Sequence, residues 1–218
     1  MKDHKNKLEK INRGILIGLR DLSEFDKATF WVMGSVVCTA LNGEYFRRIG
    51  DIDILIYEKD YEGLREFLIS KGYEIKIGRP WNLSSLSGFH WIEADNGVVY
   101  ISIIKIYQDK DDNPFIPLNF CFSAFLPKSM FVKREYKLYG IKFNGLSPEP
   151  LYIRTKLEYG ETLLNKRIKD LEILEKNIDP QKVDQLLQEK PGLKFMGIYL
   201  PINNFINSFL KTFNLQRH

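Results

Sequence analysis

The stretch that decides the fold is Met33-Gly34-Ser35, followed by Arg47-Arg48-Ile49-Gly50-Asp51-Ile52-Asp53-Ile54-Leu55-Ile56. Phe30 to Met33 is a short apolar segment that predicts a strand, and Val36 to Leu41 predicts a helix. From Asp51 onward, carboxylates alternate with isoleucines at the period of two that a strand has. The predicted order is therefore strand, Gly-Ser turn, helix and acidic strand.

The acidic strand predicts a metal site. Asp51 and Asp53 are two residues apart, so their side chains project from the same face of a strand. Two close carboxylates repel each other unless a cation lies between them. Magnesium takes one or two carboxylates together with phosphate oxygens and water, so Mg²⁺ is the cofactor that we expect. A half-exposed Asp-Ile-Asp strand without any ligand is the alternative, because short motifs give false positives.

The Gly-Ser turn predicts a phosphate site beside the metal. Glycine lets the backbone approach a phosphate closely, and the first helical N–H groups and the Ser35 hydroxyl can hold it. Arg47 adds positive charge for a leaving pyrophosphate. We therefore expect Gly34, Ser35 and Arg47 to bind a nucleotide, and Asp51 and Asp53 to hold the metal and to act in catalysis, as in phosphoryl transfer.

The rest of the chain divides into two regions. Lys5 to Phe25 has apolar residues at helical spacing and predicts one amphipathic helix. Asp95-Asn96-Gly97 predicts a hairpin turn, and Gly140 lies near the turn of a second hairpin. Ser147-Pro148 predicts a helix start, and the chain after it has a largely helical pattern. We expect an α/β domain over residues 1–146 and a helical region over residues 147–218.

Two sets of residues carry a resemblance to a known family. Gly34-Ser35, the helix after it and Asp51-Ile52-Asp53 make the sequence similar to the nucleotidyltransferase superfamily, which includes antibiotic nucleotidyltransferases, minimal nucleotidyltransferases and AbiEii-type toxins. Ser147-Pro148-Glu149, Lys156 and Arg167-Ile168-Lys169-Asp170-Leu171-Glu172 resemble the PE-L-K and R-x-KD-L pattern of the AbiEii-like branch. The likeness covers roughly residues 30 to 175.

The resemblance implies a fold and an activity. The implied fold is α/β (α+β): the nucleotidyltransferase fold, a mixed β-sheet flanked by helices, with a C-terminal helical region. The implied activity is magnesium-dependent transfer of a nucleoside monophosphate from a nucleoside triphosphate such as ATP. The acceptor is a hydroxyl on a small molecule, an RNA end or a protein, and an AbiEii-like member would belong to a toxin–antitoxin pair.

The second set of residues carries roles that rest on the resemblance. Lys156 and Asp170 are expected to be catalytic, and Lys169 is expected to bind the nucleotide. Lysines on helices that face the sheet can bind triphosphate oxygens, and Asp170 can orient one of them by pairing. The alternative for all three is a solvated charge on an amphipathic helix.

Three departures from the family pattern bear on activity. Val36 to Gly50 is a longer spacer than the family usually has, and Ile173 stands where a second aspartate follows Lys-Asp. The strand Tyr100 to Ile104 has Ser102 where the family often has a third carboxylate, which acts as general base. A serine of ordinary pKa cannot accept the acceptor's proton. Either Glu93 on the neighbouring strand does so, or the protein is a catalytically impaired nucleotide-binding protein.

Composition and charge limit the classes of partner. The formal net charge of +4 is too small to indicate nucleic-acid binding. No apolar run reaches membrane-spanning length and Met1 to Lys10 lacks a signal-peptide pattern, so we expect a cytoplasmic protein without a membrane partner. Ile202 to Phe213 predicts an amphipathic helix that packs on the domain or on a second subunit, which would make a homodimer.

Overall fold

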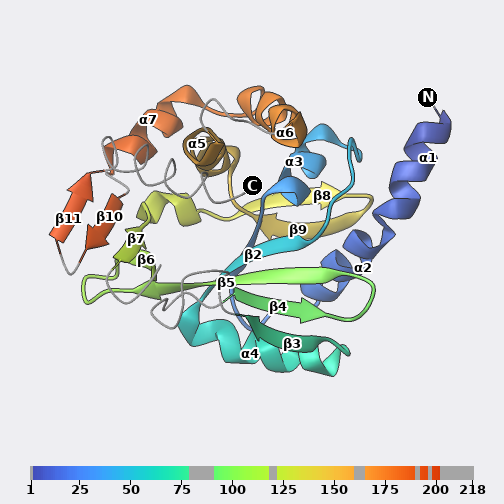
Figure 1. The fold of residues 1–218 in the computed structure, drawn as a ribbon, viewed down its shortest axis with the longest axis horizontal. Coiled ribbons are helices and arrows are strands. Elements are labelled where there is room, and N and C mark those ends of the chain that lie inside the picture. The colour runs from blue at the N-terminus through green and yellow to red at the C-terminus, as the bar shows by residue number, and fades with distance from the viewer. Residues whose placement is uncertain are drawn as a thin grey trace.

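The centre of the molecule is a mixed sheet (Figure 1). The computed structural model describes residues 2–78, 91–117, 122–159, 165–189, 192–195 and 198–201. β1 (Phe30–Met33) pairs antiparallel with β2 (Ile52–Tyr57), and β2 pairs parallel with β5 (Tyr100–Gln108). The predicted fold class, a mixed sheet flanked by helices, is therefore confirmed.

Further strands extend the sheet on both sides of β1, β2 and β5. Within the described residues the order is β11-β10-β7-β6-β5-β2-β1-β9-β8, and β4 pairs with β5 and β3 with β4. These additional strands are β3 (Glu74–Gly78), β4 (Trp91–Asp95), β6 (Pro114–Pro117), β7 (Phe122–Phe125), β8 (Arg134–Leu138), β9 (Ile141–Gly145), β10 (Gly192–Phe195) and β11 (Ile198–Pro201).

Helices cover the sheet. In Figure 1, α5, α6 and α7 lie above the central strands and α4 lies below them. The helices are α1 (Lys2–Ile11), α2 (Arg13–Ser23), α3 (Ser35–Asn42), α4 (Glu58–Ser70), α5 (Pro148–Tyr159), α6 (Asn165–Glu175) and α7 (Pro180–Gln188), with the 3-10 helix η1 (Lys128–Phe131). Among the described helices, none is both long enough and apolar enough to cross a membrane.

The core holds the acidic strand rigidly. All of β1 is buried, and Ile52, Ile54 and Ile56 of β2 have exposed fractions of 0%. These isoleucines form the face of β2 opposite Asp53, as the period of two predicts. Each one contributes roughly 1.5–3 kcal/mol through burial, so the backbone that carries Asp53 is firmly anchored.

The prediction of a single N-terminal helix is wrong, because the structure has two helices in this region. Lys5 to Phe25 does not form one helix: α1 ends at Ile11 and α2 begins at Arg13. The residue between them, Asn12, has an exposed fraction of only 1%. Its side chain makes hydrogen bonds to the backbone of a distant loop, at Arg47 and Ile49.

The C-terminal region begins as predicted but is not helical throughout. β9 ends at Gly145 and α5 begins at Pro148, where Ser147-Pro148 predicts a helix start. The division into two domains stays a prediction. However, β10 and β11 lie in the region expected to be helical, and β10 pairs antiparallel with β7. β10 is stabilised by pairing with β7 on one side and with β11 on the other, and local periodicity does not predict such pairing. The predicted helix over Ile202 to Phe213 lies outside the described residues.

Candidate nucleotide and metal site

The turn between β1 and α3 touches the acidic strand. Gly34 has φ 68° and ψ −140°, a conformation that essentially only glycine adopts. A Cβ atom at this position would lie 2.7 Å from Asp53 Oδ2. The register agrees, because Met33 is the direct partner of Asp53 across β1 and β2. The structure therefore brings the Gly-Ser turn and the Asp53 carboxylate into contact.

Three polar side chains lie next to one another across β2, β5 and β4, beside the Gly-Ser turn. Ser102 of β5 is the register partner of Asp53 on one side and of Glu93 on the other. Directly opposed residues project from the same face, so the three side chains share one face of the sheet. Ser102 is buried, and its Oγ donates a hydrogen bond to Asp51 Oδ2 at 3.2 Å. Ser102 thus supports Asp51, the residue immediately before β2.

Arg47 connects the Gly-Ser turn to α6. It lies in the loop between α3 and β2, and its Nη2 donates a hydrogen bond to Ser35 Oγ. Its Nε and Nη2 also donate to the two oxygens of Asp170, at 3.0 and 2.7 Å. This bidentate ion pair has the strongest geometry available to an arginine and a carboxylate. Arg47 therefore lies at the predicted phosphate site.

The predicted partner of Asp170 is wrong. Asp170 was expected to orient a lysine, but the structure pairs it with arginines. Besides Arg47, it lies 3.5 Å from Nη1 of Arg167, three residues earlier on α6. Asp170 is 2% exposed, and a buried carboxylate needs such charged partners. The neighbouring Lys169 lies on another side of the helix, where it is exposed.

The two lysines lie against groups other than the Gly-Ser turn. Lys156 Nζ is 3.3 Å from Glu175, and its side chain is 49% exposed. Hydrogen bonds with Tyr152 and then with Glu175 raise the pKa of Lys156. Lys169 Nζ lies 5.5 Å from the ring centroid of Phe46. The roles expected for these lysines stay predictions.

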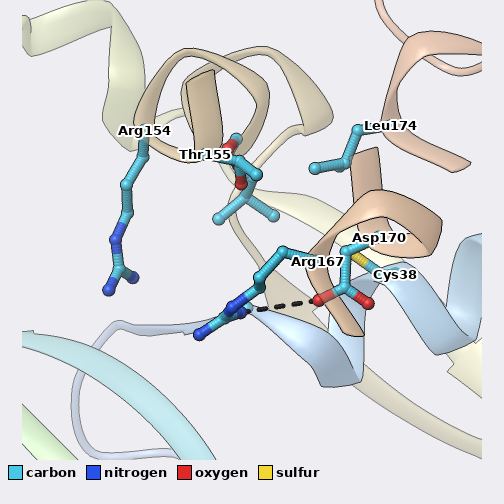
Figure 2. A pocket seen from close by; sticks show the side chains of 8 residues that line it. Cys38, Arg154, Thr155, Arg167, Asp170 and Leu174 are labelled. Atoms are coloured by element: carbon cyan, nitrogen blue, oxygen red, sulfur yellow. Dashed lines mark hydrogen bonds and ion pairs between the residues drawn. The ribbon is translucent and has the colours of Figure 1, made fainter. Parts of the chain in front are cut away.

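Two arginines lie where the lysines were expected. A small recess lies beside the Gly-Ser turn between α3, α5 and α6; we call it the Gly34 recess. It is lined by Gly34, Cys38, Leu151, Arg154, Thr155, Arg167, Asp170 and Leu174. Figure 2 shows the guanidinium groups of Arg154 and Arg167 both pointing into this space. Arg154 Nη1 also reaches Met33 Sδ at 3.8 Å, next to the Gly-Ser turn.

The orientation of α5 explains why Arg154, and not Lys156, lines the recess. Residues 154 and 156 are about 200° apart around a helix of 3.6 residues per turn, so they face nearly opposite directions. Leu151 and Thr155 are buried and mark the inner face of α5. Arg154 shares that face and Lys156 does not. The family pattern points to Lys156, and the apolar residues of α5 are spread around the helix, so the sequence carries no clear signal for Arg154.

Cys38, in the same recess, carries a buried thiol. Burial, and then the charge of Asp170, raises the pKa of its thiol to about 12. A thiol with this pKa has almost no thiolate at neutral pH, and the thiolate is the reactive form. Its role is to pack against the recess wall.

The donor set fits magnesium together with a phosphate chain. Among the described residues there is no group of three or more His, Cys, Asp or Glu side chains that could hold a metal alone. Asp51 and Asp53 offer carboxylate oxygens beside a turn suited to phosphate. Magnesium is commonly held by one or two carboxylates, with substrate phosphates and water completing its shell. The two aspartates therefore fit a metal that arrives with a nucleotide.

Comparison with solved structures identifies the fold. The structure of a lincosamide antibiotic adenylyltransferase, LnuA, bound to lincomycin, aligns with a TM-score of 0.56 and 21% identity over 75% of this chain and 96% of its own. The chain has the nucleotidyltransferase fold. The antibiotic-resistance protein ANT(2'')-Ia shares this nucleotidyltransferase fold, in complex with adenylyl-2''-tobramycin, with a TM-score of 0.54 and 13% identity over 80% and 94% of the two chains. Its solution structure aligns with a TM-score of 0.52 and 14% identity over 84% and 90%. No protein-family model matches the chain, and no curated protein sequence matches it.

Proposed function

We propose that this protein binds a magnesium–nucleoside triphosphate and transfers the nucleoside monophosphate to an acceptor hydroxyl. The observation that carries the proposal is the close approach of Gly34 to the Asp53 carboxylate. It sets the turn that we propose to bind phosphate against the acid that we propose to bind the metal. The solved structures with this fold support it, since LnuA and ANT(2'')-Ia are described as an adenylyltransferase and as a protein bound to an adenylylated antibiotic.

The residues divide the chemistry between them. Asp51 and Asp53 would hold magnesium, which neutralises charge on the phosphate chain when bound. The N–H groups at the start of α3 bind phosphate oxygens, and Arg47, Arg154 and Arg167 supply the positive charge that a leaving pyrophosphate requires.

The transfer step needs a proton acceptor. The acceptor oxygen forms a bond to the α-phosphorus, the bond from that phosphorus to the bridging oxygen breaks, and pyrophosphate leaves. The hydroxyl proton must go to a base, and a serine such as Ser102 is not one. Glu93 is the next residue in the same row across the sheet, so we assign the proton to its carboxylate.

Thermal unfolding with Mg-ATP and with Mg-CTP tests the binding half of the proposal. At about 100 times Kd, a ligand adds about 2.7 kcal/mol, which corresponds to a rise of roughly 5–10 °C in the unfolding midpoint. Asp53→Asn should abolish the rise, whereas Asp26→Asn, at an exposed position, should retain it. An unchanged rise in Asp53→Asn would remove the proposed metal site.

Ser102 favours a second candidate function, a nucleotide-binding protein with impaired catalysis. Pyrophosphate release, measured with hydroxyl-bearing small molecules, RNA ends and protein acceptors, separates the two. The transferase predicts release with at least one acceptor class and its loss in Glu93→Gln; the binding protein predicts background release throughout. Including RNA and protein acceptors also tests the AbiEii-like and toxin–antitoxin expectations, which we retain as part of this proposal.

A further inference from the structure

Asn12 is a buried polar residue outside the site described above. It lies at the break between α1 and α2 and is 1% exposed. Its Nδ2 donates a hydrogen bond to the carbonyl oxygen of Arg47 at 3.0 Å, and its Oδ1 accepts one from the backbone N–H of Ile49 at 2.8 Å. One amide thus holds the backbone on both sides of Arg48, 35 to 37 residues away in the sequence.

The loop that Asn12 holds carries site residues. Arg47 reaches Ser35 and Asp170 from it, and the same loop leads into Asp51 and β2. The Tyr45 hydroxyl adds a contact to the Asn12 carbonyl oxygen at 3.4 Å, in the buried part of the junction. Since a guanidinium is carried on a long side chain, its position depends on where the backbone of residue 47 is fixed.

We propose that Asn12 is a positioning residue that orients Arg47 for binding the nucleotide's phosphates. This inference rests on the proposed function. An amide is suited to the role, because it donates and accepts at the same time. Aspartate has a similar shape, but when ionised it lacks the donor and places a carboxylate oxygen against the Arg47 carbonyl oxygen. A one-atom change therefore disturbs the Arg47 side of the contact and leaves the acceptor for Ile49.

The first experiment compares nucleotide affinity in Asn12→Asp and in a matched control. Tyr73→Phe removes a hydrogen bond from a residue that is 3% exposed, to Asp21 on α2, without touching the loop. Asn12→Asp should raise the Kd for Mg-ATP roughly tenfold, the scale of one buried hydrogen bond, and Tyr73→Phe should leave it unchanged. Asn12→Ser, which adds no charge, serves if Asn12→Asp does not fold.

A double-mutant cycle tests whether Asn12 acts through Arg47. In an Arg47→Met background, Asn12→Asp should produce no further loss of affinity, because the group that it positions is gone. An equal loss with and without Arg47 would overturn the proposal, since Asn12 would then act on the fold in general. Equal affinities in the wild type and in the Asn12 variants would overturn it as well.

A measurement without ligand separates this inference from the proposed function. The Nε–H resonance of Arg47, assigned by its loss in Arg47→Met, reports the hydrogen bond to Asp170. Asn12→Asp should shift or broaden it, and Tyr73→Phe should not. An undisturbed resonance in Asn12→Asp overturns the positioning role. Failure of wild-type protein to bind any nucleotide would instead overturn the proposed function, while the resonance still tests the link from Asn12 to Arg47.

Discussion

Two properties of position 34 each favour glycine. The backbone has positive φ, and the space that a Cβ would occupy lies 2.7 Å from Asp53 Oδ2. Gly43 at the other end of α3 also has positive φ, but a Cβ there would have nothing within 4 Å. Gly43, with ψ −14° in the left-handed αL region instead of −140°, is therefore a control for a positive φ without the contact to Asp53.

Gly34→Ala is predicted to destabilise the protein and to abolish nucleotide binding. Backbone strain costs about 1–3 kcal/mol, and the alanine methyl group additionally displaces the Asp53 carboxylate. Gly43→Ala should show only the strain and should keep the midpoint rise with Mg-ATP. Urea unfolding and thermal shift measure both effects. If the two variants bind nucleotide equally well, the contact between Gly34 and Asp53 is not part of the site.

At the scale of elements, the phase of α5 determines which cation reaches the Gly34 recess. Arg154 lines the recess, and Lys156 pairs with Glu175 on α6. An exposed ion pair of this kind contributes at most about 1 kcal/mol. Losing it should therefore have a small effect on stability and none on phosphate binding.

We predict that Arg154→Met weakens nucleotide binding and that Lys156→Met does not. Methionine keeps most of the aliphatic stem in both variants and removes only the charge. Arg154→Met should raise the Kd for Mg-ATP about tenfold or more, because it removes a charge-assisted hydrogen bond to phosphate. Isothermal titration of both variants gives the comparison. The reverse result would restore the role expected for Lys156 from the family pattern.

At the scale of the whole molecule, a buried thiol and buried tyrosine hydroxyls make the stability of the fold decrease at alkaline pH. Burial raises the pKa of Cys38 from 9.0 to about 12. Burial is also the largest cause of the raised pKa values of Tyr45, Tyr73 and Tyr136. These groups stay protonated in the folded chain at a pH at which they ionise in the unfolded chain. Their contribution is therefore complete below the unfolded pKa and is lost as pH rises.

Stability should fall steadily from about pH 9 to pH 12. Each such group adds a slope of about 1.4 kcal/mol per pH unit while only the unfolded form ionises. Urea unfolding at several pH values measures the slope. In Cys38→Ala, the part of the pH-dependent fall in stability that begins near pH 9 should be absent. The stability of this variant at neutral pH should also be lower. A flat profile above pH 9 would contradict the burial of these groups.

Local pattern alone predicted much of the fold. The period of two in Asp51 to Tyr57, the apolar spacing in α4 and the turns at Gly97 and Gly140 depend only on near neighbours, and the structure has these elements. The face of β2 on which Asp53 lies, opposite the buried isoleucines, and the glycine before α3 could be predicted for the same reason. Strand and helix geometry fixes the direction of each side chain relative to residues two to four positions away.

Tertiary structure decided which side chains meet. Arg47 and Asp170 are 123 residues apart, Asp51 and Ser102 are 51 apart, and Asn12 interrupts a helix to hold the loop at Arg47. The pairing of β10 with β7 likewise depends on strand order. Hydrophobic periodicity determines which face of an element is buried but not which distant element buries it. The family pattern points to Lys156, whereas the packing of α5 against α6 places Arg154 in the recess.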